Sequence, residues 1–92
     1  MQYSYDKNKK ALNLAKHGFD FDDAKQVIER NKTITYEDDR FGYGEQRFIT
    51  IGLLQNALVV IVTSETENEI RIISMRKAEK HEQTKYYENI NR

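Results

Sequence analysis

Runs of β-branched and apolar residues, broken by short polar stretches, dominate the second half of the chain, whereas its two ends have helical spacing. The apolar runs predict five strands, over residues 2–5, 33–37, 45–54, 57–64 and 69–73. The run 57–64 is nearly all apolar, which is typical of a central strand with both faces buried. The pattern therefore predicts a sheet whose middle is formed by the second half of the sequence.

Two helices are predicted between the first and second strands. Asp6 suits the N-cap of the first helix, and Gly18 stands where a left-handed residue usually ends a helix. Asp20 would cap the second helix, with acidic residues in its first turn as the helix dipole prefers. The buried stripe of this second helix would consist of Phe21, Ala24, Val27 and Ile28.

A third helix is predicted over residues 77–90, directly after the last strand. Ser74 stands where a helix N-cap would be, so that the first turn would contain Arg76 and Lys77. Cations in a first turn are repelled by the helix dipole, and a bound phosphate would relieve this repulsion. The alternative is a solvated, charged turn without a ligand.

The last three predicted strands are separated by very short turns at residues 55–56 and 67–68, which implies an antiparallel meander. With two N-terminal helices and one C-terminal helix packed on this antiparallel sheet, the fold class is α+β. The 92 residues form a single small domain, residues 1–92, with no linker or internal repeat.

The two short turns also predict a row of side chains across the meander. Two-residue turns would set Arg47 opposite Ser64, and Ser64 opposite Arg71, all on one face of the sheet. The two arginines would then converge on one phosphodiester. A bulge at Gly52 would shift the register by one residue and put the arginines on opposite faces.

The composition narrows the classes of function. Lysine and arginine together number 15, as do aspartate and glutamate, so the bulk charge does not indicate a strongly basic nucleic-acid binder. The absence of cysteine excludes disulfides and thiol catalysis, and it fits a reducing cytosol. The N-terminus lacks the apolar core of a secretory signal, and the longest apolar run is too short to span a bilayer. A cytoplasmic protein without membrane contact is expected.

The sequence contains no metal-binding motif, no glycine-rich phosphate loop and no serine nucleophile elbow. The remaining chemistry is that of Arg, Lys, Glu, His, Ser and Tyr side chains without a metal or other cofactor. These groups suit the cleavage of RNA, in which the neighbouring 2′-hydroxyl is the nucleophile and the protein supplies proton transfer and charge stabilisation. Because DNA lacks this hydroxyl, such a site would favour RNA.

Several segments together resemble the BrnT family, toxins of type II toxin–antitoxin systems that are related in fold to the RelE ribonucleases. The family pattern is KHG before an F-x-x-A helix, a D-x-R…YGE-x-R loop and strand, and an R-I-I-S-x-R-K-A junction. In this chain these motifs are residues 16–18, 21–24, 38–47 and 71–78. The chain departs from the pattern at Tyr5, where tryptophan is usual, and at Met75, where alanine is common, but neither departure removes a charged group.

The resemblance implies a RelE-like fold and a metal-independent ribonuclease that inhibits growth by blocking translation. It also implies a small DNA-binding antitoxin similar to BrnA, which neutralises the toxin and represses the operon with it. Operator DNA would then be bound only through the antitoxin. The alternative is a non-catalytic module that binds nucleic acid or the antitoxin as a co-repressor, and a plain structural module is the third reading.

The candidate catalytic residues are mainly cations. Arg71 and Arg76 are the first candidates for binding the scissile phosphate, because an arginine in an isoleucine-rich strand needs a partner. Arg47 is the third cation. Glu45 would transfer a proton or orient these groups, or it would form a salt bridge with Arg47 or Arg71.

The remaining candidates have structural alternatives. Histidine titrates near neutrality, which would suit His17 as a general base, but its place before a helix-ending glycine equally suits bonding to the last helix carbonyls. Tyr86 would stack on a base, or it would pack in the core. The further RNA-binding candidates are Lys77, Lys80 and Arg40.

Overall fold

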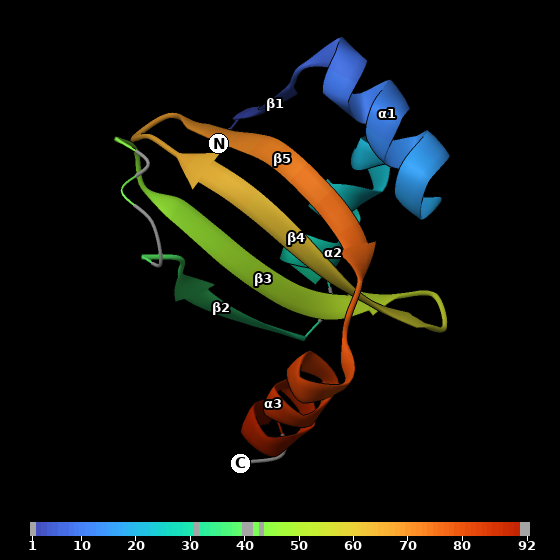
Figure 1. Ribbon diagram of the computed structural model, residues 1–92. Coiled ribbons are helices and arrows are strands. Elements are labelled where there is room, and N and C mark those ends of the chain that lie inside the picture. The colour runs from blue at the N-terminus through green and yellow to red at the C-terminus, as the bar shows by residue number, and fades with distance from the viewer. Residues whose placement is uncertain (1, 31, 40–41, 43, 91–92) are drawn as a thin grey trace.

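The computed structural model describes residues 2–30, 32–39, 42 and 44–90, and it has the predicted order of strands and helices (Figure 1). The strands are β1 (Gln2–Tyr5), β2 (Thr33–Glu37), β3 (Arg47–Leu54), β4 (Ala57–Glu65) and β5 (Glu69–Lys77). The helices are α1 (Lys7–His17), the 3₁₀ turn η1 (Phe21–Asp23), α2 (Ala24–Arg30) and α3 (Lys80–Ile90). The predicted α+β class is confirmed.

The predicted caps Asp6, Gly18 and Asp20 are confirmed, although a 3₁₀ turn and not an α-helix follows Asp20 directly. The Asp6 carboxylate accepts hydrogen bonds from the backbone N–H groups of Asn8 and Lys9, at 2.8 and 3.1 Å. Gly18 follows α1 in the left-handed conformation, with φ 78°. Asp20 caps η1 by accepting from the N–H of Asp22, and η1 leads directly into α2. These caps satisfy backbone groups that a helix end would otherwise leave unpaired.

The sheet is mixed, which corrects the prediction of an antiparallel sheet. The strand order is β1-β5-β4-β3-β2, and β1 pairs with β5 in parallel, with Gln2 opposite Glu69 and Tyr5 opposite Ile72. The other three pairings are antiparallel, so the predicted meander of β3, β4 and β5 is confirmed. Strand β1 is short and its partner lies far away in the sequence, so no local turn signal could fix its direction.

The register of the meander follows the predicted turns, with one bulge in an unexpected place. Pairing runs regularly between β3 and β4. Between β4 and β5 the register shifts by one residue, which leaves Ile73 without a partner. No bulge occurs at Gly52, where an added Cβ would lie only 2.8 Å from Thr33 Cγ2 and 2.9 Å from Val27 Cγ1. Glycine is therefore required at this position because α2 and β2 approach the strand closely.

The last strand is longer than predicted, and Ser74 is not a helix cap. Strand β5 continues through Arg76 and Lys77, and α3 begins only at Lys80. The predicted cationic first turn of a helix is therefore wrong. Residues after the bulge pair with β4, and Met75 between them is fully buried, so sheet pairing and burial outweigh the local helix propensity.

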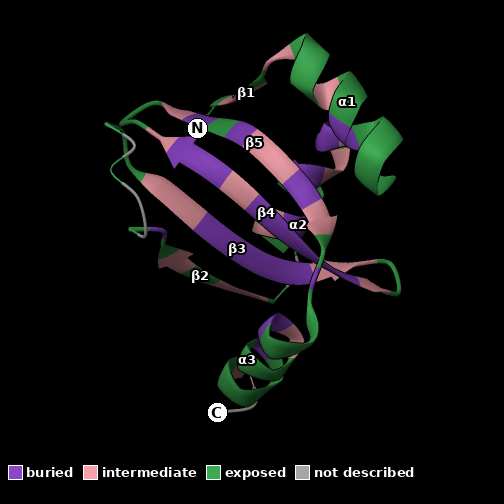
Figure 2. Ribbon diagram, in the orientation of Figure 1, coloured by how far each residue is buried: buried purple, intermediate pink, exposed green. Residues whose placement is uncertain are grey.

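Buried residues run along the middle strands of the sheet (Figure 2), and they form two hydrophobic clusters, one on each face. The cluster under α1 and α2 consists of Phe21, Ala24, Val27, Val59, Ile61, Ile70, Ile72 and Met75. The cluster under α3 consists of Ile49, Ile51, Leu58, Val60, Ala78 and Tyr86. Strand β4 contributes to both clusters, as expected for a central strand, and each fully buried large side chain contributes roughly 1.5–3 kcal/mol.

A buried amide from α1 completes the hydrogen bonding at the edge of β5. Asn13 donates from Nδ2 to the carbonyl oxygen of Met75 at 2.9 Å, and its Oδ1 accepts from the N–H of Met75 at 3.1 Å. The same Nδ2 also donates to the carbonyl of Phe19. The side chain thus takes the place of a neighbouring strand beyond the end of β1, and it fixes α1 against the sheet.

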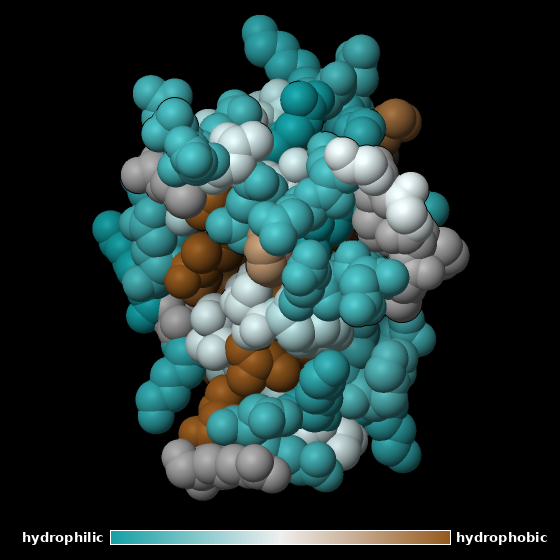
Figure 3. All heavy atoms as spheres, turned by 90° about the vertical axis from the view of Figure 1, so that its left-hand side faces the viewer, coloured by the Kyte–Doolittle hydropathy of each residue, from teal (hydrophilic) through white to brown (hydrophobic). Residues whose placement is uncertain are grey.

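The surface is mostly polar. In the view of Figure 3, hydrophilic side chains cover most of the molecule, and hydrophobic groups reach the surface in small patches. Among the described residues, the exposed large hydrophobic side chains are Tyr5, Leu12, Leu14 and Tyr87. No helix in the described ranges is long and apolar enough to cross a membrane.

Candidate functional site

The α3 side of the sheet has an end covered by α3 and an open end, over which no described helix lies. Helix α3 lies where β5 leaves the sheet, and the strands extend away from it toward the β4–β5 turn (Figure 1). At this far end the same face carries Ser4, Arg71, Ser64 and Arg47, which are cross-strand partners on β1, β5, β4 and β3. The predicted row of Arg47, Ser64 and Arg71 is therefore confirmed, and Ser4 extends it by one strand.

The two arginines of this row flank a buried serine. Neighbouring strands lie about 4.8 Å apart, so the Cα atoms of Arg47 and Arg71 are roughly 10 Å apart across Ser64. Arg71 is exposed, and within the described residues its guanidinium forms no hydrogen bond or ion pair. The Ser4 Oγ beside it is buried without a hydrogen-bond partner. The Arg71 guanidinium and the Ser4 hydroxyl therefore have donors available to bind an anion.

Glu45 joins the row from the loop before β3. One carboxylate oxygen accepts from Arg47 Nε at 3.1 Å, and the other accepts from Ser64 Oγ at 3.1 Å. The hydrogen bond from Arg47, then that from Ser64, with the charge of Arg71 adding to them, lowers the pKa of Glu45 below its ordinary value. The carboxylate is therefore ionised at neutral pH and is held between the two arginines.

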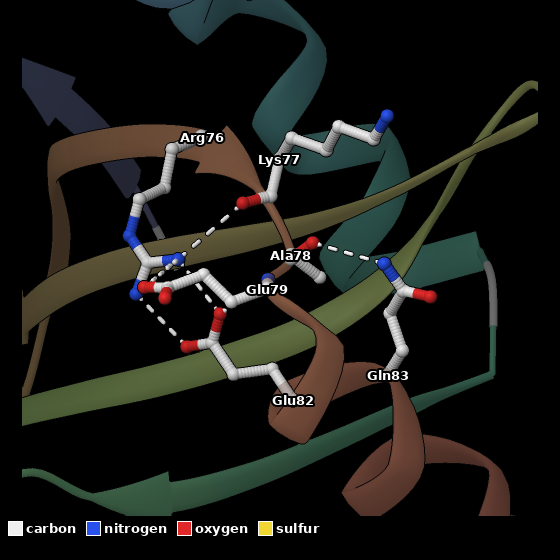
Figure 4. A network of polar contacts seen from close by, with 6 residues as sticks. All are labelled: Arg76, Lys77, Ala78, Glu79, Glu82 and Gln83. Carbon is white, nitrogen blue, oxygen red and sulfur yellow. Dashed lines mark hydrogen bonds and ion pairs between the residues drawn. The ribbon is translucent and has the colours of Figure 1, made fainter.

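Arg76 lies on the same face of β5 but points toward α3 (Figure 4). Its two terminal nitrogens donate to the two carboxylate oxygens of Glu82, at 2.7 and 2.9 Å. The Glu82 side chain is only 6% exposed, and the more distant Glu79 carboxylate lies 3.9 Å from Arg76. The bonds to Glu82 raise the pKa of Arg76, so the guanidinium stays charged. Five residues of strand, roughly 16 Å, separate Arg76 from Arg71.

Glu82 also forms the cap of α3. Its Oε1 accepts from the backbone N–H of Glu79 at 2.8 Å, which is the return bond of a capping box. Burial alone would raise the pKa of Glu82, but the bonds from Arg76 and from the Glu79 N–H outweigh it and leave the pKa below its usual value. Strand β5 and α3 are thus fastened together by one buried carboxylate.

The structure places the other candidates outside the row. His17 lies at the C-terminal end of α1, in a groove beside Ile73. Lys77 lies toward the other end of β5, near the β3–β4 turn, and Lys80 is exposed at the start of α3. Tyr86 is 1% exposed and donates to the carbonyl of Lys32, so its ring packs in the core and cannot stack on a base. Arg40 lies outside the described residues.

Two residues that fasten helices to β5 escaped the sequence analysis. Glu82 had only half of a capping-box signal, because Glu79, three residues before it, is not one of the usual N-cap residues. Asn13 had none, because its partner Met75 lies 62 residues away in the sequence. Among the described residues, no group of three His, Cys, Asp or Glu side chains is arranged to hold a metal ion.

Together, the α+β fold and the row of cations around an ionised carboxylate make this sheet face the candidate anion-binding surface of a small protein. The chain matches, over residues 5–82, the family model described as the ribonuclease toxin BrnT of type II toxin–antitoxin systems. It therefore belongs to this family of ribonuclease toxins, whose type implies an antitoxin partner. No match was found among curated proteins.

Proposed function

We propose that this toxin is a metal-independent endoribonuclease with a RelE-like arrangement of its sheet and helices. Its cleavage of RNA inhibits translation, and a BrnA-like DNA-binding antitoxin neutralises it. The observation that carries the proposal is the row on the open end of the sheet, where Arg47 and Arg71 flank the ionised Glu45. Membership in a family of ribonuclease toxins supports RNA as the substrate.

In this proposal the arginines bind the scissile phosphate. Side chains from two positions roughly 10 Å apart can converge on one phosphodiester lying over Ser64. The guanidinium groups then stabilise the negative charge that develops on the phosphate oxygens in the transition state. Arg71 is exposed and its donors are available before RNA binds. It is therefore the first candidate of the two arginines for binding the phosphate. Arg76 contributes charge to the same face but acts mainly through its attachment to α3.

Glu45 accepts the proton from the attacking group. The 2′-oxygen attacks the adjacent phosphorus and the bond from phosphorus to the 5′-oxygen breaks, which gives a 2′,3′-cyclic phosphate and a 5′-hydroxyl. The 2′-hydroxyl proton passes to the Glu45 carboxylate, and a solvent water donates the proton that the leaving 5′-oxygen takes up. The Glu45 carboxylate is ionised and so can take up this proton, although its lowered pKa makes it a weaker base than an ordinary glutamate.

The test is cleavage of single-stranded RNA by the purified toxin, with and without a chelator. The double variant Arg47→Ala, Arg71→Ala is expected to lose at least about 100-fold in rate, and chelation is expected to leave the wild-type rate unchanged. Arg30→Ala, which removes an exposed arginine on α2, is the matched control and should cleave normally. Binding of RNA without cleavage would instead support the non-catalytic module, and loss of activity with chelator would contradict the metal-independent mechanism.

A further inference from the structure

A groove between α1 and the edge of β5 lies apart from the proposed active site. It is a shallow groove, open to solvent, with a volume of about 270 Å³, and the residues lining it are Lys9, Leu12, Asn13, Lys16, His17 and Ile73. Leu12 is 69% exposed, which is unusual for a leucine in a helix that packs against a sheet. Leu12 and Ile73 together give the groove an apolar surface with polar side chains around it, and apolar patches with polar rims mark surfaces that bind other proteins.

The floor of the groove is built by two features of the fold. Ile73 is the extra residue of the β5 bulge, and it lines the groove although the residues on either side of it pair with β4. Asn13, bonded to both backbone groups of Met75, holds α1 at a fixed distance from this strand. The groove is therefore formed before any partner binds, which reduces the entropic cost of binding.

The rim of the groove is cationic. Helix α1 contains four lysines and no acidic residue. Lys10 is neutralised by Asp22 and Asp20, at 2.8 and 3.6 Å, on the side facing η1. Lys9 and Lys16, which line the groove, form no ion pair within the described part of the chain. An apolar floor with lysines along its rim is complementary to a helix that has leucine-like side chains on one face and carboxylates beside them.

We propose that this groove binds an acidic amphipathic helix of the antitoxin. The inference rests on the proposed function only in naming the antitoxin as the partner. Single-stranded RNA fits the groove less well, because bases stack on aromatic rings and the groove offers Leu12 and Ile73. A second copy of the chain also fits poorly, since a two-fold contact would bring the lysines of one α1 against those of the other.

The test is calorimetric titration of the purified toxin with its cognate antitoxin. Leu12→Glu is expected to raise the Kd at least about tenfold, because it puts a carboxylate into the groove in which the acidic helix would bind. The double variant Lys9→Glu, Lys16→Glu is expected to weaken binding about tenfold and to remove most of its dependence on salt. Leu14→Glu is the matched control, since Leu14 is also exposed on α1 but does not line the groove.

Each outcome decides the proposal. A Leu12→Glu variant that binds the antitoxin as tightly as the wild type would overturn it, provided that circular dichroism shows an intact fold. Loss of single-stranded RNA binding in this variant, with antitoxin binding unchanged, would assign the groove to RNA. Concentration-dependent sedimentation that only the wild type shows would assign it to a second copy. Titration measures binding and not cleavage, so failure of the nuclease proposal would leave this result intact.

Discussion

Arg71 and Arg76 lie on the same strand and the same face of the sheet, but their surroundings differ. Arg76 uses both terminal nitrogens to hold Glu82, whose side chain is 6% exposed, and this pair fixes α3 to β5. Arg71 is exposed and forms no hydrogen bond with any described residue. The difference indicates that Arg71 has all its donors available for a ligand, whereas Arg76 uses its terminal nitrogens to support the fold.

The largest expected effect separates the two arginines by activity. Arg71→Ala should lower kcat/KM for RNA cleavage by about 100- to 1,000-fold, because it removes a donor to the transition-state charge. Its melting temperature should stay within about 2 °C of the wild type, since the side chain holds no other described group in place. Cleavage kinetics and thermal denaturation measure the two quantities.

The matched variant for this comparison is Arg76→Ala. It should lower the melting temperature more than Arg71→Ala does, because the buried Glu82 would lose its partner. Its rate of cleavage per folded molecule should fall less. A fully active Arg71→Ala protein beside a folded but inactive Arg76→Ala protein would reverse the assignment of the two arginines.

The second effect concerns stability at the covered end. Glu82→Gln should lower the free energy of unfolding by about 1–3 kcal/mol, because glutamine keeps the shape but leaves the Arg76 charge uncompensated. The Arg76 side chain is 30% exposed, and water that reaches it keeps the loss below that of a fully buried pair. Urea denaturation measures the change.

Glu79→Gln is the control for this stability effect. The Glu79 side chain is 67% exposed and lies 3.9 Å from Arg76, so its loss should change stability by less than about 0.5 kcal/mol. Equal effects of the two substitutions would show that burial does not make the Arg76–Glu82 pair stronger than an ion pair at the surface.

The position of Arg71 in a row with Ser64 and Arg47 could be predicted from the sequence. The short turns at residues 55–56 and 67–68 set the register that puts Arg47, Ser64 and Arg71 in one row, because side chains alternate strictly along paired strands. The caps at Asp6 and Gly18 were predictable because their chemistry is local. Features determined within a few residues of the chain were thus predicted well.

Two features missed by the sequence analysis depend on contacts between distant segments, and a third, the Arg76–Glu82 pair, joins residues six positions apart. The helix-forming residues after Ile73 lie in a strand because β4 offers them partners and a buried site for Met75. The direction of β1 depends on a partner more than 60 residues away. The Arg76 side chain looked like a phosphate ligand because its partner Glu82 becomes a neighbour only once α3 turns back on the sheet.

The smallest expected effect is the pH dependence of the Arg76–Glu82 pair. Because the folded protein lowers the pKa of Glu82, the unfolded chain binds the proton more readily. The stability gained from this carboxylate is therefore present above its unfolded pKa, about 4.3, and is lost as the pH falls through the lower folded value. The difference in unfolding free energy between the wild type and Glu82→Gln should be constant near neutrality and should shrink below about pH 4. Urea denaturation across this range measures it, and Asp6, Asp22 and Glu45 cancel because both proteins retain them. A difference that grew as the pH fell would mean that burial, and not Arg76, determines the state of Glu82.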